Sequence, residues 1–246
     1  MRHLLSKGKR AARNAYRDLV AVDPVDARRD RGFASFTFDD FPVSALTVGG
    51  ALLEADGYRG TYYASMGLAG QDLAVGQVFS RDDLLRCHGN GHEVAQHTFA
   101  HVRCTGLTRQ EILADRAENA AALAPIEARN FAYPYGALNG SVKALMRRHF
   151  ASCRGTRDGL NGRRTDLADL KANRIYSRLG VAGLMPLIQR AAETGGWLIF
   201  YTHDVAPVPS PYGCTPDEMR RVINAVGQAG LAVGTISEGL ARLLPE

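Results

Sequence analysis

Short apolar segments and helical stretches alternate along this chain from residue 33 onward. The apolar segments are rich in aromatic and β-branched residues, as buried strands are. Between them, apolar positions recur at the spacing of amphipathic helices. Such alternation predicts a parallel β-sheet, either doubly wound or closed as a barrel. The predicted strands span residues 33–38, 61–65, 93–96, 131–134, 151–154, 173–177, 197–202 and 231–236.

Helix-capping signals locate several of the helices between these strands. A hydroxyl residue followed three positions later by an acid opens a helix at Ser80 and Asp83, at Thr108 and Glu111, and at Thr215 and Glu218. Further helices are predicted at 43–56, 141–150 and 181–193, and a loop at 157–164. No linker rich in proline, glycine or serine divides the chain. We therefore expect one domain over residues 31–246, preceded by an extension over residues 1–30.

Polar side chains gather at the carboxyl ends of the predicted strands. Asp39 and Asp40 end the first apolar segment, His97 follows the third, and His203 follows a later one. Carboxylates at the end of a buried strand are costly unless a metal or a cation pairs with them. In parallel α/β folds, the carboxyl ends of the strands carry the functional site. With Tyr135 past another strand, these residues predict a single site.

Three histidines lie within ten residues, at positions 92, 97 and 101. The segment does not match the His-Glu-x-x-His motif of zincins, because a glutamine stands where the second histidine would be. His97 and His101 are four positions apart and would face the same side of a helical turn. Two imidazoles and a carboxylate form a three-ligand zinc site with an open position for water. His92 is predicted to be structural, and His88 and His149 to be surface or packing groups.

Together these motifs resemble those of the polysaccharide deacetylases with NodB homology, carbohydrate esterase family four. The chain contains Thr37-Phe38-Asp39-Asp40, His97-Thr98-Phe99-Ala100-His101, Phe131-Ala132-Tyr133-Pro134-Tyr135-Gly136 and His203-Asp204. Their order and spacing agree with the family over about residues 33–240. The resemblance implies a distorted (β/α)7-type barrel, a divalent metal that is usually zinc, and hydrolysis of an N-acetyl group from an amino sugar.

The resemblance also implies a role for each site residue. The metal ligands would be Asp40, His97 and His101. Asp39 would be the base that activates the attacking water, and His203 would protonate the leaving amine. The backbone N–H of Tyr135 would help to hold the oxyanion. These roles suit amide hydrolysis, in which a poor electrophile must be activated and an amine needs a proton to leave.

One residue of the family pattern is missing. The arginine that orients the base in the family is replaced by Ala132. We predict that another arginine takes over this contact, with Arg174 as the first candidate and Arg163 or Arg164 as the second. The Asp/Trp motif of the family is also unclear, because residues 166–170 contain two acids but Leu in place of Trp.

The substrate pocket is expected to be aromatic. Phe41 follows the acid pair where the family has glycine, and Phe41 and Tyr201 are predicted to shape a wall of the pocket. The motif at residues 131–136 adds Tyr133, Pro134 and Tyr135. The predicted pocket residues are Phe41, Tyr133, Pro134, Tyr135 and Tyr201.

The charge of the chain is concentrated at its N-terminus. The 246 residues carry a formal net charge of +5, and much of the excess lies in residues 1–31. No zinc-finger spacing or RNP-type aromatic run accompanies it, so we expect no nucleic-acid partner. A solvated basic helix is the simplest expectation for the extension. Peripheral contact with the inner face of a membrane is an alternative, carried by an apolar helix face of Leu4, Leu5, Ala12, Tyr16 and Leu19.

The N-terminus lacks the apolar core of a signal peptide, since Leu4 and Leu5 are followed at once by a basic stretch. No segment approaches the roughly 20 apolar residues of a membrane span. We therefore expect a cytoplasmic protein. Free thiols are expected at the four cysteines, Cys87, Cys104, Cys153 and Cys214.

The first functional hypothesis is a metal-dependent hydrolase that removes an N-acetyl group from an amino sugar in a glycan or glycan precursor. A cytoplasmic location favours a nucleotide- or lipid-linked carbohydrate of surface polysaccharide biosynthesis. Two alternatives stay open at this point. One is hydrolysis of another non-peptide C–N bond, in a ureide or an amide, and the other is a non-catalytic carbohydrate-binding homologue.

Overall fold

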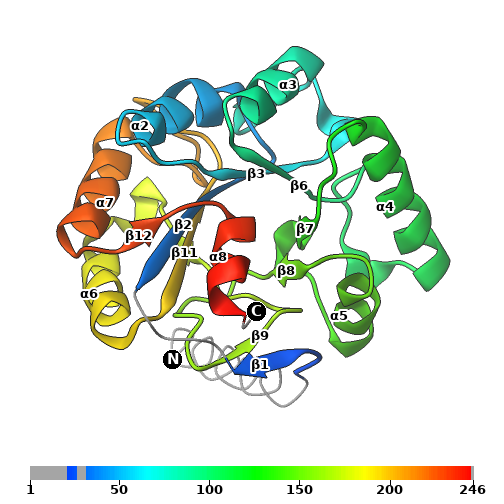
Figure 1. Cartoon of the computed structure of the whole chain (residues 1–246). Helices are drawn as coiled ribbons and strands as arrows, with labels where there is room; N and C mark the ends of the chain where they lie inside the picture. The colour runs from blue at the N-terminus through cyan, green and yellow to red at the C-terminus, as the bar shows by residue number, and fades with distance from the viewer. Residues whose placement is uncertain (1–20, 27–31, 245–246) are drawn as a thin grey trace, which may run out of the picture.

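The fold is built on one curled parallel sheet (Figure 1). The computed structural model describes residues 21–26 and 32–244. Across the sheet, the strands are β10 (Asn173–Arg174), β11 (Trp197–Thr202), β2 (Phe33–Asp39), β3 (Thr61–Ala64), β6 (Glu93–Gln96), β7 (Asn130–Ala132) and β8 (Ser152–Arg154), with β12 (Ala232–Val233) beside β2. All neighbours in this sheet run parallel. The prediction of a parallel sheet is therefore confirmed.

Helices follow most strands and surround the sheet (Figure 1). They are α2 (Ala51–Glu54), α3 (Arg81–Gly89), α4 (Arg109–Leu123), α5 (Gly140–Arg147), α6 (Met185–Thr194), α7 (Pro216–Gln228) and α8 (Ile236–Leu243). The last of these, α8, lies in the middle of the ring in Figure 1, where its Ile236 and Leu240 pack with Phe33 and Trp197. Since Phe33 and Trp197 begin β2 and β11, α8 covers the end of the sheet opposite to the strand carboxyl ends.

The sheet is buried on both faces, as parallel sheets are. All seven residues of β2 are buried. The larger apolar cluster lies between the sheet and the outer helices and includes Phe36 and Phe200, whose rings stack 5.1 Å apart. A second cluster, with Tyr63 and Ile199, contains the residues that point to the other face. These two apolar clusters pack against both faces of the sheet and hold in place the strands whose carboxyl ends carry the polar residues.

The predicted capping boxes are confirmed. In each, the hydroxyl accepts from the backbone N–H three positions on, while the acid accepts from the capping residue's own N–H. A fourth box, not predicted, opens α8 at Thr235 and Glu238. This cap explains why the predicted strand at 231–236 is wrong in length: β12 ends at Val233 because α8 begins at Ile236.

The predicted helix at 43–56 is helical but not uniformly α. Ala45–Gly50 is wound as a π-helix before α2 begins. A Cβ at Gly49 would come within 2.8 Å of Phe38, and one at Gly50 within 2.7 Å of the Tyr62 hydroxyl. These glycines therefore allow the widened turn to lie directly against β2 and β3. π-Helical turns occur frequently at functional sites, and this one follows Asp40 closely.

Three other predicted elements are shorter than expected. The strand at 131–134 ends at Ala132, because Pro134–Gly136 forms a 3₁₀ turn, and the strand at 173–177 ends at Arg174. The helix predicted at 181–193 begins as a 3₁₀ turn at Ala182–Leu184. In α6, Pro186 occupies the first turn, where its missing N–H has no intrahelical partner to lose.

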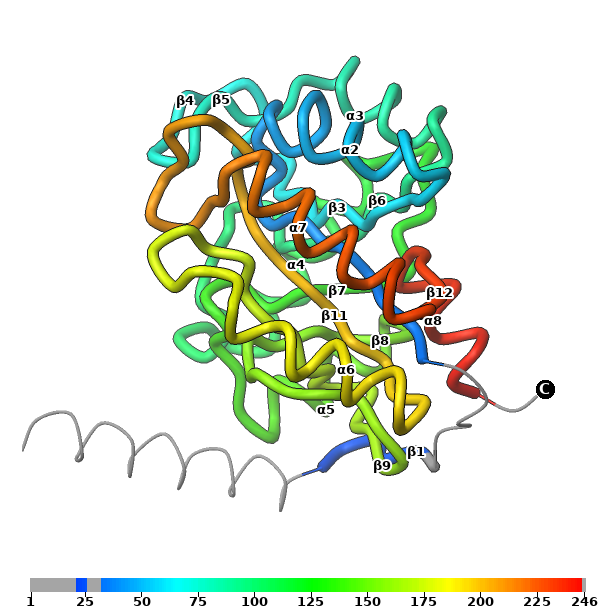
Figure 2. The backbone as a smooth tube through the Cα atoms, turned by 90° about the vertical axis from the view of Figure 1, so that its left-hand side faces the viewer, coloured from blue at the N-terminus to red at the C-terminus, as the bar shows by residue number. Residues whose placement is uncertain are grey.

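Two small antiparallel pairs were not predicted (Figure 2). The strand β1 (Pro24–Asp26) pairs with β9 (Arg164–Asp166), so part of the predicted extension joins the domain and the predicted loop at 157–164 ends in a strand. The strands β4 (Asp72–Leu73) and β5 (Gly76–Gln77) form a hairpin. Both pairs are too short and too polar to give a strand pattern.

The predicted basic helix and its apolar face lie in residues 1–20, outside the described residues. Over residues 21–26 and 32–244, no helix has both the length and the apolar character needed to cross a membrane.

Candidate functional site

A cleft of about 550 Å³ opens at the carboxyl ends of the central strands. Asp39 and Asp40 reach it from the end of β2, and His97 from the residue after β6. His203 enters from the residue after β11, and His101 from the loop that follows His97. The sheet therefore brings all five polar residues singled out in the sequence to one cleft.

Asp40, His97 and His101 converge on one point. One ligand atom from each lies within 4.8 Å of the others. The Nε2 atoms of His101 and His97 lie 3.0 and 3.5 Å from Oδ1 of Asp40. That oxygen is buried and receives no hydrogen bond of good geometry from the residues described. Three electron-pair donors aimed at one another in this way fit a divalent metal, for which two imidazoles and a carboxylate are a usual ligand set.

The protonation states of two of these residues suit metal binding. Nδ1 of His97 donates to the carbonyl oxygen of Ala132 over 2.8 Å, which leaves Nε2 with its lone pair toward Asp40. Burial lowers the pKa of His97 to about 4, although Asp39 and Asp40 act in the opposite direction. Burial alone would raise the pKa of Asp40, but His101, His97 and His203 outweigh it and lower that pKa. Near neutral pH, His97 is therefore neutral and Asp40 ionised.

The backbone around the cleft is strained. Among the described residues, the non-glycine positions with positive φ are Asp40, Phe41, Thr98, His101 and Tyr135, with φ between 47° and 62°. Asp40, Thr98, His101 and Tyr135 belong to the motifs that predicted the site, and Phe41 directly follows one of them. Left-handed conformations of this kind cost about 1–3 kcal/mol each and cluster at functional sites. The concentration of this strain around one cleft supports a functional role for these turns.

Arg154 supplies the cation beside Asp39. Its Nη2 donates to Oδ1 of Asp39, and its Nη1 donates to the carbonyl oxygen of Gly155 over 2.9 Å. The guanidinium is fully buried between the rings of Tyr63 and Tyr201, with Cζ 4.9 Å from each centroid. Burial alone would lower the pKa of Arg154, but the Asp39 carboxylate outweighs it and raises that pKa. Arg154 is therefore charged and holds Asp39 in place.

The prediction that Arg174 contacts Asp39 is corrected by this geometry. Arg174 lines the cleft, but its Nη2 pairs with Asp158. Arg154 instead stands directly beside Ala132, its partner in the parallel register of β7 and β8. The guanidinium thus comes from the strand next to the one that carries Ala132. As the last residue of a predicted strand, Arg154 could have been found by the same strand-end argument as Asp39.

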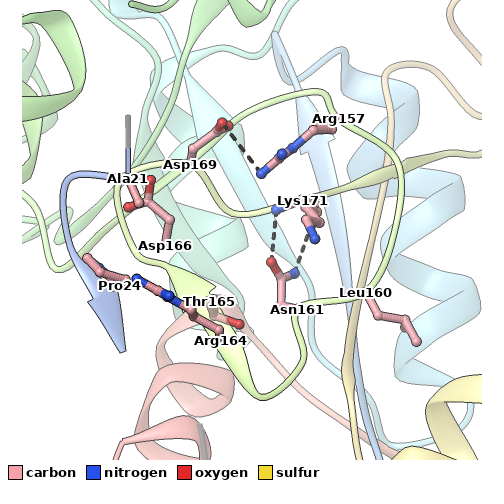
Figure 3. A pocket seen from close by; sticks show the side chains of 10 residues that line it. All are labelled: Ala21, Pro24, Arg157, Leu160, Asn161, Arg164, Thr165, Asp166, Asp169 and Lys171. Atoms are coloured by element: carbon pink, nitrogen blue, oxygen red, sulfur yellow. Dashed lines mark hydrogen bonds and ion pairs between the residues drawn. The ribbon is translucent and has the colours of Figure 1, made fainter. Parts of the chain in front are cut away.

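A second cavity, of about 450 Å³, contains one of the two other arginines considered for this role, and Arg163, the other one, is exposed and lines neither cavity (Figure 3). Arg164 lines this cavity and not the cleft, so it does not reach Asp39. The two acids of the unclear Asp/Trp motif also line it. Nζ of Lys143 pairs with Asp166 at 2.5 Å, and Arg157 lies 3.9 Å from Asp169. Both acids therefore form ion pairs outside the cleft.

The predicted aromatic pocket is only partly correct. Tyr135 and Tyr201 line the cleft, whereas Phe41, Tyr133 and Pro134 do not. Phe41 is fully buried against the rings of Tyr62 and Phe79, because the turn after Asp40 points it into the core. Tyr133 is also buried, and its hydroxyl donates to the carbonyl oxygen of Ala168 over 3.0 Å. The oxyanion role of the Tyr135 N–H stays a prediction.

His92 is structural, as predicted. Its Nδ1 accepts from the backbone N–H of Gly60 over 3.0 Å, so its Nε2 donates to Glu54 over 2.8 Å. His88 and His149 are exposed, which also agrees with the sequence.

The loop after β11 orients His203. Nδ1 of His203 donates to the carbonyl oxygen of Tyr212 over 3.2 Å, which leaves Nε2 facing the site, 3.7 Å from Oδ2 of Asp40. The carboxylate of Asp204 holds this loop by accepting from the backbone N–H of Ser210 over 2.7 Å and from its hydroxyl. Asp204 is therefore a positioning residue for His203.

We expect Asp204→Ala to lower kcat by up to about a hundredfold with a smaller change in KM, because a small displacement of a proton donor is costly. Steady-state kinetics on an acetylated substrate measures both constants. Asp217→Ala is the matched control, since Asp217 is exposed at the start of α7. An unchanged kcat in Asp204→Ala would show that the loop does not position His203.

Comparison with known proteins matches the chain to one protein family. The family model described as Polysaccharide deacetylase matches residues 26–151, a little over half of the chain. No curated protein matches the sequence significantly.

Several solved structures share the fold at low sequence identity. The Xyl-CE4 domain of a multidomain xylanase from the hindgut metagenome of Trinervitermes trinervoides is 18% identical, with a TM-score of 0.59 over 85% of this chain and 89% of its own. A family 4 carbohydrate esterase from Streptomyces lividans, in complex with acetate, is 17% identical, with a TM-score of 0.58 over 87% and 98%. A CE4 family pseudoenzyme from Bacillus anthracis is 15% identical, with a TM-score of 0.61 over 87% and 67%. These similarities confirm the predicted fold.

Proposed function

Because the chain belongs to the polysaccharide deacetylase family, we propose that it removes an N-acetyl group from an amino sugar in a glycan or glycan precursor. One observation carries the proposal. In a single cleft, three candidate metal ligands converge within 4.8 Å of one another. Asp39, which forms an ion pair with Arg154, lines the same cleft. This arrangement offers a metal position, a carboxylate base and an imidazole acid, which are the groups that amide hydrolysis requires.

Asp40, His97 and His101 would hold the metal, and their nitrogen and oxygen donors make Zn²⁺ the first choice. When bound, a zinc ion would polarise the acetyl carbonyl and lower the pKa of its water to about 7. Nδ1 of His97 is fixed on the Ala132 carbonyl, so this ligand needs no reorientation before binding.

The protein's own groups would carry the proton transfers. Asp39 would accept the proton of the attacking water, with Arg154 holding the carboxylate in one orientation. Nε2 of His203 would give a proton to the leaving amine, since Nδ1 is engaged by the Tyr212 carbonyl. The N–H of Tyr135 would stabilise the oxyanion, a contribution worth roughly 3–4 kcal/mol in comparable sites.

We further propose that the reaction belongs to surface polysaccharide biosynthesis in the cytoplasm, with a nucleotide- or lipid-linked carbohydrate as substrate. The many lysines and arginines within residues 1–30 would attract this segment to an anionic membrane surface and so favour peripheral contact. Removal of residues 1–20 should then lower binding to anionic lipid vesicles without changing turnover of a soluble sugar. Unchanged vesicle binding would contradict this part of the proposal.

The direct test is acetate release from a panel of N-acetylated sugars, with and without a chelator. We expect turnover of at least one sugar, loss of turnover after chelation, and recovery on adding Zn²⁺. Metal analysis of Asp40→Asn should show loss of the bound ion, because one of three protein ligands is weakened. Release of ammonia or carbamate from ureides, without acetate release, would instead indicate another C–N hydrolase. Sugar binding without any turnover would indicate a non-catalytic homologue.

A further inference from the structure

Two arginines flank the catalytic residues on opposite sides of the cleft. Arg103 lies in the loop after β6, and Arg178 lies in the short turn that follows β10. In the order of the sheet, β10 is two strands from β2 on one side and β6 is two strands from β2 on the other. Since Asp39 ends β2 and Asp40 follows it, the cleft extends from these acids toward both arginines.

Each arginine lies on a tyrosine that in turn contacts a site histidine. On one side, Cζ of Arg103 lies 4.2 Å above the ring of Tyr135, whose centroid is 4.6 Å from that of His101. On the other side, Cζ of Arg178 lies 5.8 Å from the ring of Tyr212, whose centroid is 5.6 Å from that of His203.

Further contacts hold Arg178 in place. Nε of Arg178 donates to the carbonyl oxygen of Pro211 over 2.6 Å, and its Cζ lies 5.4 Å from the ring of Tyr176. A guanidinium stacked on a ring loses less conformational freedom when it binds an anion. The two arginines are therefore partly ordered before substrate binds.

The charges of the cleft do not balance. Its lining residues include Arg103, Arg174 and Arg178, and its acids are Asp39 and Asp40. Asp39 is neutralised by Arg154, which lies behind the cleft, and Arg174 is paired with Asp158. Asp40 belongs to the candidate metal centre. Over residues 21–26 and 32–244, neither Arg103 nor Arg178 forms an ion pair with an acid.

We propose that this cleft selects a negatively charged glycan, in which oxyanions beside the acetylated amino sugar are bound by Arg103 and Arg178. The inference rests on the deacetylase function proposed above and names its substrate class. Guanidinium groups bind carboxylates and phosphates through paired N–H donors. The exposed faces of Tyr135 and Tyr212 offer apolar surface to the sugar rings that carry these anions. Such an oxyanion could be the carboxylate of a uronate next to the amino sugar or a phosphate at the anomeric oxygen of that sugar.

The test compares three substrates that differ in charge near the acetylated sugar. They are the neutral N-acetylglucosamine trimer, a trisaccharide with N-acetylglucosamine between two glucuronates, and N-acetylglucosamine 1-phosphate. We expect kcat/KM at low salt to be at least about tenfold higher for a charged substrate than for the neutral one. Added salt should reduce that ratio, because exposed charges are screened. A higher value for the uronate trisaccharide identifies a carboxylate as the anion, and a higher value for the sugar phosphate identifies a phosphate.

Arg103→Gln and Arg178→Gln test the two arginines directly. Each should lower the charged-to-neutral ratio by about tenfold or more through KM, and the double variant should lower it further. Arg129→Gln is the matched control, since Arg129 is exposed just before β7, at the opposite end of that strand from the cleft. It should leave the ratio unchanged.

The possible outcomes separate this inference from the proposed function. Acetate release with equal kcat/KM for charged and neutral sugars would overturn the charge preference and leave the deacetylase function intact. A ratio unaffected by both arginine variants would also overturn it. If no sugar releases acetate, the proposed function fails. Calorimetric titration of Asp39→Asn with the same three sugars then decides whether the cleft prefers charge.

Discussion

Asp39→Asn is expected to lower kcat for acetate release by about 10²–10⁴-fold, the usual contribution of a positioned general base. The amide keeps the size of the side chain and can still contact Arg154, but it cannot take a proton from the attacking water. KM should change much less, because the substrate contacts of the cleft remain. Single-substrate kinetics with an acetate-coupled assay gives both constants.

Two further variants show whether this loss is specific. Metal content should stay near the wild-type value in Asp39→Asn and fall in Asp40→Asn, since only Asp40 belongs to the converging ligand set. Asp56→Asn is the surface control, because Asp56 pairs with Arg220 at the periphery and such pairs contribute little to stability. If Asp39→Asn kept more than about a tenth of the wild-type kcat, Asp39 would not be the base.

The sequence is sufficient to predict where the site lies, because its residues are tied to strand ends. Asp39, Asp40 and His203 each follow a strand whose apolar run is easy to recognise, and parallel pairing then places them together. His97 follows the shorter strand β6 and is placed by the same rule. For these residues, the position predicted from the local apolar pattern is the position that the parallel sheet gives them.

The sequence is not sufficient where the contact depends on register or on a turn. Arg154 of β8 lies beside Ala132 of β7 and supplies the arginine that is missing at that position. To predict this from the sequence, one would have to know which residues of two three-residue strands stand side by side. Phe41 looks like a pocket residue because it follows Asp40, but a left-handed turn directs it into the core. The pair of β1 and β9 brings together segments about 140 residues apart, and neither has an apolar pattern.

Loss of stability is expected to accompany loss of activity when Arg154 is replaced. Arg154→Met removes the cation and preserves much of the side-chain volume, so the Asp39 carboxylate is left buried without its partner. Breaking a buried ion pair in this way costs about 3–5 kcal/mol, which chemical denaturation should show as a lower free energy of unfolding. Arg154→Lys should lose less, because it retains the charge but not the forked donors or the stacking on Tyr63 and Tyr201.

A double-mutant cycle separates the ion pair from the packing of Arg154. If the pair dominates, Asp39→Asn combined with Arg154→Met should be less destabilising than the sum of the single changes, because no charge is then left buried alone. Arg174→Ala should cost only about 0–1 kcal/mol, since its partner Asp158 is exposed. Additive effects in the cycle, or an equal loss from Arg174→Ala, would contradict the assignment. With a dominant pair, Arg154 both keeps the Asp39 base in position and allows a carboxylate to be buried at the end of β2.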